Sequence, residues 1–276
     1  MYKRILTIQD ISCVGQCSIT VALPILSACG VETSILPTAV LSTHTGGFKN
    51  FTFRDLCEDI PGIIKHWKSE NIMFDAIYTG YLGNCDDVNY VKEIAENLLA
   101  EDSKLIVDPA MGDNGKLYYG FNEKYVEAMR SLCEKADLIL PNITEACFLL
   151  GISYPENVTV EIVDAIKCDL HKKFGADVVL TGVGFATGET GVSVLCGGNK
   201  YHYNHMRIGQ SFHGTGDIYA SAFVGALMKN KSVLASAQIA ADYVVKCIEN
   251  TLDDKSHWYG VKFETALSSL IETINS

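Results

Sequence analysis

Residues 212–220 combine groups that can bind an anion with a group that can accept a proton. Gly214 and Gly216 flank Thr215 directly before Asp217, where a long apolar helix is predicted to begin. The first N–H groups of a helix favour negative charge, and glycine lets the backbone approach an anion closely. We therefore predict an anion hole beside a base. The alternative is an ordinary helix cap made by Thr215 or Asp217.

Two other segments place carboxylates where predicted strands end. The segment DPAMGD puts Asp108 and Asp113 after one strand, and PNITE puts Asn142 and Glu145 at the start of a helix. Magnesium prefers oxygen ligands, so carboxylates at these positions can hold it directly or through water. The alternatives are a solvated turn for the first segment and a capping motif for the second.

Other ligand-binding patterns are incomplete in this sequence. The glycines of residues 182–188 do not have dinucleotide-fold spacing, and no GxxxxGK[ST] loop occurs. His202 and His205 are spaced like metal ligands but have no third ligand nearby in the sequence. The ten cysteines are scattered singly. We therefore expect neither a zinc site nor disulfides.

The elements that must position these residues follow from the apolar pattern. Short apolar runs of strand length occupy residues 5–8, 34–36, 74–78, 104–107, 138–140, 178–180 and 192–195. Helical periodicity lies between most of them, for example at Val88, Val91, Ala95 and Leu98. This alternation predicts an α/β fold with a mostly parallel sheet covered on both faces. Ligands of such sheets bind at the carboxyl ends of the strands.

The last third of the chain has a different pattern. We predict a hairpin over residues 191–204 and helices over 215–228, 232–250 and 262–274. Because no linker-like tract interrupts the chain, we predict a single domain over residues 1–276.

Composition limits the possible partners. The chain has 276 residues, 48% of them hydrophobic, which is enough for a substantial core. Its 22 Lys and Arg against 33 Asp and Glu give a net charge of −11, which disfavours nucleic acid and anionic membrane surfaces as partners. No apolar stretch approaches the roughly 20 residues of a membrane span, and no export signal is evident, so we expect a cytoplasmic protein.

The motifs together resemble a known family. The sequence STHTGG at residues 42–47, then DPAMGD, PNITE and GTGD, in this order, resemble the ribokinase-like superfamily, and within it the bacterial pyridoxal/pyridoxamine kinases. The resemblance covers nearly the whole chain and implies a three-layer sandwich with a central sheet. It also implies ATP-dependent phosphorylation of the 5′-hydroxymethyl group of pyridoxal, pyridoxamine or pyridoxine, with Mg²⁺ as cofactor, in a homodimer. A requirement for a monovalent cation such as K⁺ stays open.

The resemblance also suggests roles on the phosphate side. Asp217 would be the base that takes the proton of the substrate hydroxyl group. The N–H groups of Gly214, Thr215 and Gly216 would stabilise charge on the transferred phosphoryl group. The nucleotide would be bound by Asp108, Asn142, Glu145 and Thr181, and the magnesium by Asp108, Glu145 and Asp113.

On the vitamin side, the family pattern implies that the ring is bound by Asp10, His44, Thr45, Gly46 and Tyr81. For Tyr81 the alternative is simple packing. Asp10 is a departure, because many pyridoxal kinases have serine there. We expect Asp10 directly after the first strand, facing the ring, and the alternative is that it caps the following turn.

Two other functions remain open at this point. Related kinases of hydroxymethylpyrimidine, which act in thiamine synthesis, typically have cysteine after GTG, where this chain has Asp217. A binding protein that keeps the vitamin pocket without turnover would have no chemical need for a base beside an anion hole. Both alternatives are therefore disfavoured by Asp217.

Overall fold

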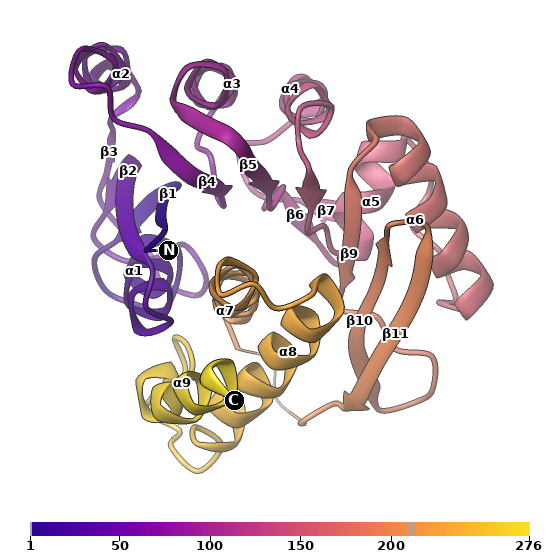
Figure 1. The fold of residues 1–276 in the computed structure, drawn as a ribbon. Helices are drawn as coiled ribbons and strands as arrows, with labels where there is room; N and C mark the ends of the chain where they lie inside the picture. The colour runs from indigo at the N-terminus through magenta and orange to yellow at the C-terminus, as the bar shows by residue number, and fades with distance from the viewer. Residues whose placement is uncertain (1, 210–211) are drawn as a thin grey trace. The chain divides into compact units, whose positions relative to one another are not determined.

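The computed structural model describes residues 2–209 and 212–276. The chain divides into two compact units, which we describe one at a time. Unit 1 comprises Met1–Ile63 and Ile208–Ser276, and unit 2 comprises Ile64–Arg207. Figure 1 follows the chain through both units by colour.

Unit 1 is built on three strands within its described residues. Strand β1 (Arg4–Ser12) pairs in parallel with β2 (Glu32–Leu41), and β2 pairs in antiparallel fashion with the short β3 (Phe53–Asp55). Six successive residues of β1, from Ile5 to Asp10, are buried. A strand buried on both faces is typical of a parallel sheet covered by helices.

The helices of unit 1 come from both ends of the chain. They are α1 (Ile19–Ala28), α7 (Thr215–Met228), α8 (Val233–Glu249) and α9 (Leu267–Asn275), with short 3₁₀ turns at Cys57–Asp59 and Phe263–Ala266 and with the start of α2 (Ile60–Ser69). Helix α7 is apolar on almost every side, and it is buried because it contacts both α1 and α8. This packing fixes the amino end of α7, where GTGD lies.

Unit 2 holds the rest of the mostly parallel sheet. Its strands β4 (Phe74–Thr79), β5 (Leu99–Val107), β8 (Leu138–Ile139) and β9 (Asp177–Thr181) run parallel in this order. An antiparallel hairpin of β10 (Glu189–Cys196) and β11 (Asn199–Met206) continues from β9. The small hairpin of β6 (Gly112–Asp113) and β7 (Lys116–Leu117) follows the end of β5.

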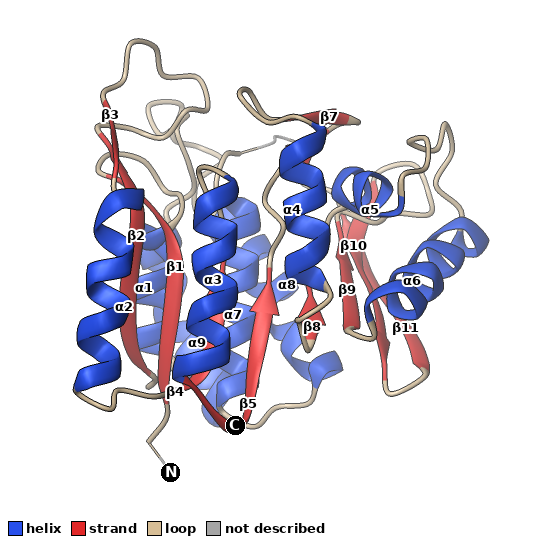
Figure 2. Cartoon of the chain, turned by 90° about the horizontal axis from the view of Figure 1, so that it is seen from above, coloured by secondary structure: helices blue, strands red, loops and turns tan. Residues whose placement is uncertain are grey.

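The helices of unit 2 begin at side-chain caps. These helices are α3 (Cys85–Leu98), α4 (Glu123–Cys133), α5 (Ile143–Leu150) and α6 (Val160–Phe174), capped by Asn84, Asn122, Asn142 and Thr159. Figure 2 shows α3 and α4 side by side, and the two helices are in contact. Each cap accepts hydrogen bonds from backbone N–H groups that the helix itself leaves free.

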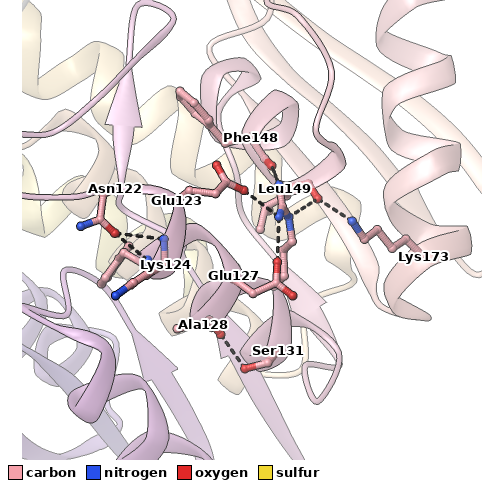
Figure 3. Close-up of polar contacts among 11 residues, drawn as sticks. Asn122, Glu123, Lys124, Glu127, Ala128, Ser131, Phe148, Leu149 and Lys173 are labelled. Atoms are coloured by element: carbon pink, nitrogen blue, oxygen red, sulfur yellow. Dashed lines mark hydrogen bonds and ion pairs between the residues drawn. The ribbon is translucent and has the colours of Figure 1, made fainter.

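The carboxyl end of α5 is held by basic side chains. Arg130 of α4 donates hydrogen bonds to the carbonyl oxygens of Phe148 (2.6 Å) and Leu149 (3.1 Å), and Lys173 of α6 donates to Leu149 (2.8 Å) (Figure 3). Glu123 and Glu127 orient the Arg130 guanidinium at 2.9 and 2.8 Å. Positive groups at this end complement the helix dipole and fix the helix that carries Glu145.

Most predicted elements are confirmed. The predicted α/β sandwich has its mostly parallel central sheet and flanking helices. The hairpin of β10 and β11 and helix α7 fall where the sequence placed them, whereas the last predicted helix, 262–274, is a 3₁₀ turn followed by α9. The prediction of one domain stays a prediction. No helix among the described residues is long and apolar enough to cross a bilayer.

One placement was wrong. Asp10 does not follow the first strand but lies within it, because β1 continues to Ser12. The alternative that Asp10 caps the following turn stays open, because its side chain accepts hydrogen bonds from Ser12 and from Ser18, on either side of that turn.

Candidate active site

The GTGD segment forms the start of α7. Gly214 is the residue before the helix and has left-handed backbone conformation (φ 77°). A Cβ atom at Gly214 would lie 1.6 Å from the carbonyl oxygen of Gln16, so only glycine fits there. At Gly216 a Cβ atom would meet no atom of the described residues within 4 Å, apart from its chain neighbours and its own helix backbone. The backbone at Gly216 is therefore open to a ligand.

Asp217 has the environment of a base. The backbone N–H of Ser18 donates a hydrogen bond to Asp217 Oδ2 at 2.9 Å, the single hydrogen bond that its carboxylate receives within the described residues. Burial raises the pKa of Asp217 to about 6, the Ser18 bond opposes this, and the negative charge of Asp10 adds to it. A carboxylate with a pKa near neutrality and a free oxygen can accept a proton efficiently.

The helix-cap alternative for this segment is wrong. No side chain of the described residues caps the amino end of α7, neither Thr215 nor Asp217. The Thr215 hydroxyl instead donates to the carbonyl of Phe212 at 3.3 Å, and Asp217 accepts from Ser18 of another segment. Within the described residues, the first N–H groups of α7 therefore have no capping side chain, as an anion hole requires.

Asp10 lies next to this base. Its side chain is 4% exposed and accepts a hydrogen bond from Ser12 Oγ at 2.9 Å. Burial raises the pKa of Asp10, while hydrogen bonds from the Ser18 and Ser12 side chains lower it. Ser18 thus contacts both carboxylates: its hydroxyl donates to Asp10, and its N–H donates to Asp217. The backbone of Ser18 has a positive φ of 57°. Burial and both carboxylates raise the pKa of the nearby Cys17, which stays a neutral thiol.

His44 is held in one tautomer. The N–H of Gly46 donates to His44 Nδ1 at 3.0 Å, so this nitrogen carries no proton. Nε2 therefore carries it and donates to the Tyr259 carbonyl oxygen at 2.7 Å. Burial lowers the pKa of His44, which keeps the ring neutral. Thr45 beside it is exposed.

His213 contacts the same segment from the GTGD side. Its ring centroid lies 5.4 Å from that of His44. A Cβ atom at Gly46 would lie 2.5 Å from His213 Nδ1, so the glycine allows the imidazole to pack directly on the backbone. The structure thus brings Asp10, His44, Gly46 and the GTGD segment together in unit 1.

In unit 2, Glu145 is the central carboxylate. It is 2% exposed, and its two oxygens accept from the backbone N–H of Met111 (3.0 Å) and of Asn142 (2.9 Å). Burial raises the pKa of Glu145 to about 7 despite these bonds. With Asn142 it forms a capping box, so the capping alternative is confirmed. Glu145 joins the loop after β5 to the start of α5.

The other residues predicted to bind the nucleotide or its magnesium ion lie in the loop after β5, at the end of β9 or at the start of α5. Asn142 donates from Nδ2 to the carbonyl of Gly112 at 2.8 Å and forms a parallel bridge with Thr181. Asp108 accepts from the N–H of Ala110 at 3.1 Å. Asp113 is exposed and bonds the side chain and N–H of the next residue, as in the solvated turn considered above.

This arrangement suits a magnesium ion that keeps its waters. No group of three or more His, Cys, Asp or Glu that could hold a metal occurs in the part of the chain that the structure describes. The oxygens of Glu145 already accept backbone N–H groups. Magnesium often keeps several waters and is bound through one or two carboxylates together with substrate phosphates. The residues fit that mode.

Tyr81 is part of a stack of rings in unit 2. Its ring lies 5.3 Å from that of Phe121, which stacks in parallel on Tyr125 at 3.8 Å. The Tyr125 hydroxyl donates to the Leu82 carbonyl at 2.7 Å. Tyr81 is half-buried, so packing accounts for one part of its surface and its predicted contact with the vitamin stays a prediction.

The two histidines considered for zinc have other partners. His202 lies 3.4 Å from Asp164 and 2.9 Å from the hydroxyl of Ser193, while His205 bonds the carbonyl of Met206. All ten cysteines are free thiols in the structure.

Comparison with known proteins identifies the family. The phosphomethylpyrimidine kinase family matches residues 23–261. The chain belongs to this family. A crystal structure of a Bacteroides thetaiotaomicron protein with pyridoxal is similar to it over 98% of this chain and 96% of that one, with 34% identity and a TM-score of 0.93. Pyridoxal kinase from Lactobacillus plantarum has 30% identity and a TM-score of 0.90 over 99% and 98% of the two chains. Pyridoxal kinase of Arabidopsis thaliana is 26% identical over 91% of this chain and 83% of its own length.

Several contacts in the site of this family member were not predicted from its sequence. The donors to Asp217 and Glu145 are backbone N–H groups of Ser18 and Met111, and the acceptor for His44 is the backbone carbonyl of Tyr259. Side-chain identity says nothing about such groups. His213 could have been noticed, because it directly precedes the first glycine of GTGD.

Proposed function

We propose that this chain is a pyridoxal kinase, which transfers the terminal phosphoryl group of ATP to the 5′-hydroxymethyl group of pyridoxal, pyridoxamine or pyridoxine. The observation that carries the proposal is Asp217, whose pKa is about 6 and which receives one hydrogen bond within the described residues. The similarity to a pyridoxal kinase at 30% identity and to a protein crystallised with pyridoxal at 34% supports this substrate class.

In the proposed reaction, unit 1 binds the vitamin and moves the proton. Asp217 accepts the proton of the hydroxymethyl group as the hydroxymethyl oxygen attacks the terminal phosphorus of ATP and ADP leaves. The N–H groups at Gly214, Thr215 and Gly216 stabilise the charge on the phosphoryl oxygens. Asp10 and Thr45 offer polar contacts to the pyridine ring substituents, while the neutral His44, whose two ring nitrogens already bond Gly46 and Tyr259, would contact the vitamin through the face or edge of its ring.

Unit 2 is proposed to bind the nucleotide. Asn142 and Thr181 would contact its phosphates, and Asp108, Asp113 and Glu145 would hold the magnesium ion through its waters. When bound, Mg²⁺ neutralises part of the phosphate charge. Because the whole chain is acidic, the positive charge of Mg²⁺ and the neutral donors of Asn142 and Thr181 would have to offset an unfavourable general field.

Phosphorylation of hydroxymethylpyrimidine is the second candidate, since the matching family is that of phosphomethylpyrimidine kinases. Turnover of pyridoxal, pyridoxamine, pyridoxine and hydroxymethylpyrimidine, measured side by side with Mg²⁺ and ATP, separates the two. We expect at least one B6 vitamer to be the preferred substrate by kcat/KM. Preference for the pyrimidine would contradict the proposal.

We also propose that the enzyme is a cytoplasmic homodimer, as the resemblance to pyridoxal kinases implies. Light scattering of the purified chain at micromolar concentration tests the assembly. A monomer at that concentration would contradict the proposed dimer.

A further inference from the structure

The turn between α8 and α9 is held in one shape. Asp254 accepts hydrogen bonds from the N–H and the hydroxyl of Ser256 at 3.0 and 2.5 Å, and from Lys262 Nζ at 2.6 Å. These bonds hold the pKa of Asp254 well below its ordinary value. Nδ1 of His257 lies 2.8 Å from the carbonyl oxygen of Gly260, which closes the turn.

This turn contacts the predicted vitamin-binding segment through Trp258. A Cβ atom at Gly47 would lie 2.8 Å from the indole, so the ring packs directly on the glycine backbone, where φ is 83°. The same indole lies 4.7 Å from the ring of Phe48. Trp258 nevertheless stays 46% exposed.

The turn makes a second contact through its backbone. The Tyr259 carbonyl accepts the Nε2 proton of His44 and so sets its tautomer. The ring of Tyr259 lies 6.2 Å from that of Phe48. Residues 44–48 are therefore held at both ends by residues 257–260, while Gly46 and Gly47 between them have no side chains that could restrain the segment.

We propose that residues 257–260 form a positioning element for the vitamin, in which Trp258 restrains residues 45–48 so that Thr45 and His44 are in place before the substrate binds. The inference rests on the proposed function for the identity of the substrate. Two adjacent glycines give the free segment much conformational freedom, and freedom lost on binding weakens affinity. Because the indole already restrains the segment in the free protein, this loss of freedom does not occur when the vitamin binds. The restraint is therefore expected to strengthen the affinity for the vitamin and to leave the affinity for the nucleotide unchanged.

The test compares Trp258→Ala and Trp258→Phe with wild type. Trp67→Phe in α2 is the matched control, because Trp67 is the other of the two tryptophans and packs on Phe74. Calorimetry gives the Kd of pyridoxal without ATP, and steady-state assays give kcat and the KM of each substrate. We expect Trp258→Ala to raise the Kd and KM of pyridoxal roughly three- to tenfold. The kcat and the KM of ATP should stay within about twofold, Trp258→Phe should restore most of the affinity, and Trp67→Phe should match wild type.

A second variant keeps the inference testable if Trp258→Ala does not fold. Asp254→Asn loosens the turn without changing a residue that touches 44–48, and we expect the same selective rise in the Kd of pyridoxal at smaller size. An unchanged Kd in the folded Trp258 and Asp254 variants would overturn the inference. Loss of ATP affinity and kcat together with pyridoxal affinity would also overturn it, because that pattern indicates a general structural role.

The same measurements separate this inference from the proposed function. If wild type binds pyridoxal but does not phosphorylate it, the proposed function fails, and the Kd values still decide the role of Trp258. If wild type binds no vitamer, both fail.

Discussion

Each unit of the molecule places a carboxylate in the first turn of a helix. Asp217 does so in unit 1 and Glu145 in unit 2, and burial raises their pKa values to about 6 and about 7. The hydrogen bonds differ. Both oxygens of Glu145 accept backbone N–H groups, whereas Asp217 receives one bond, from Ser18, within the described residues.

The difference shows why a raised pKa alone does not identify a base. Glu145 has the higher pKa, but its two oxygens together join two pieces of backbone, at Met111 and Asn142, and protonation of either oxygen would weaken one of these bonds. Asp217 has an oxygen available for a substrate proton, beside the helix N–H groups of the GTGD segment. Under the proposed function, Glu145 would therefore order the backbone near the nucleotide, and Asp217 would act on the substrate.

The largest expected effect is that of Asp217→Asn on turnover. Removal of a general base typically lowers the rate about 100- to 10,000-fold, and Asn keeps the shape and the Ser18 contact. ATP affinity, measured by calorimetry, should be nearly unchanged because no phosphate ligand is lost. A variant that keeps more than about a third of wild-type turnover would show that Asp217 is not the base.

The two glycines before Asp217 should respond differently. Gly214→Ala places Cβ against the Gln16 carbonyl at positive φ, and we expect it to lower the free energy of unfolding by about 2 to 4 kcal/mol. Gly216→Ala has space in the structure. It should leave the melting temperature nearly unchanged and still reduce turnover, because the methyl group stands where phosphate is proposed to approach.

Thermal melting and kcat/KM of the two variants check this pair. Normal turnover in a stable Gly216→Ala variant would mean that the open backbone at Gly216 is not an anion site. In that case the amino end of α7 would have no special role in binding phosphate compared with the amino end of α5.

Glu145→Gln should have a smaller effect and of a different kind. A glutamine side chain has one accepting oxygen, so either Met111 or Asn142 loses its acceptor, at a cost of about 1 to 3 kcal/mol in stability. We expect the KM of ATP to rise more than kcat falls, because the loop of Gly112 loosens. A loss of kcat as large as that of Asp217→Asn, with an unchanged KM of ATP, would give the two carboxylates the same role.

The sequence predicted local features of this molecule well and long-range backbone contacts poorly. Strands of unit 2 were found because apolar runs are a local signal. Asp10 was placed after β1 because polar residues usually end a strand, but here Gln9 bonds Thr7 and Asp10 bonds Ser12 inside the buried strand. The bond from Ser18 to Asp217 joins residues 199 positions apart, and its donor is a backbone N–H that any residue has.

The smallest expected effect concerns the coupling between Asp10 and Asp217 in unit 1, both of them buried, whereas in unit 2 the carboxylate whose charge raises the pKa of Glu145 is the exposed Asp113. The negative charge of Asp10 contributes to the raised pKa of Asp217. A neutral residue at position 10 removes this repulsion, so ionised Asp217 becomes more favourable and its pKa falls. Asn is the suitable substitution because it keeps an oxygen that can accept from Ser12.

In the pH profile of kcat/KM, the acid limb reports the base of the free enzyme, which must be ionised to act. For wild type we expect this limb near pH 6, with activity lost as the pH falls through it. In Asp10→Asn the limb should move to lower pH, while the exposed Asp86→Asn on α3 should leave it in place. A change in vitamer KM alone, with the limb fixed, would assign Asp10 to ring binding without influence on the base. A limb that moves to higher pH would mean that Asp10 supports the ionised form of Asp217 through the Ser18 contact, against the expected repulsion between the two charges.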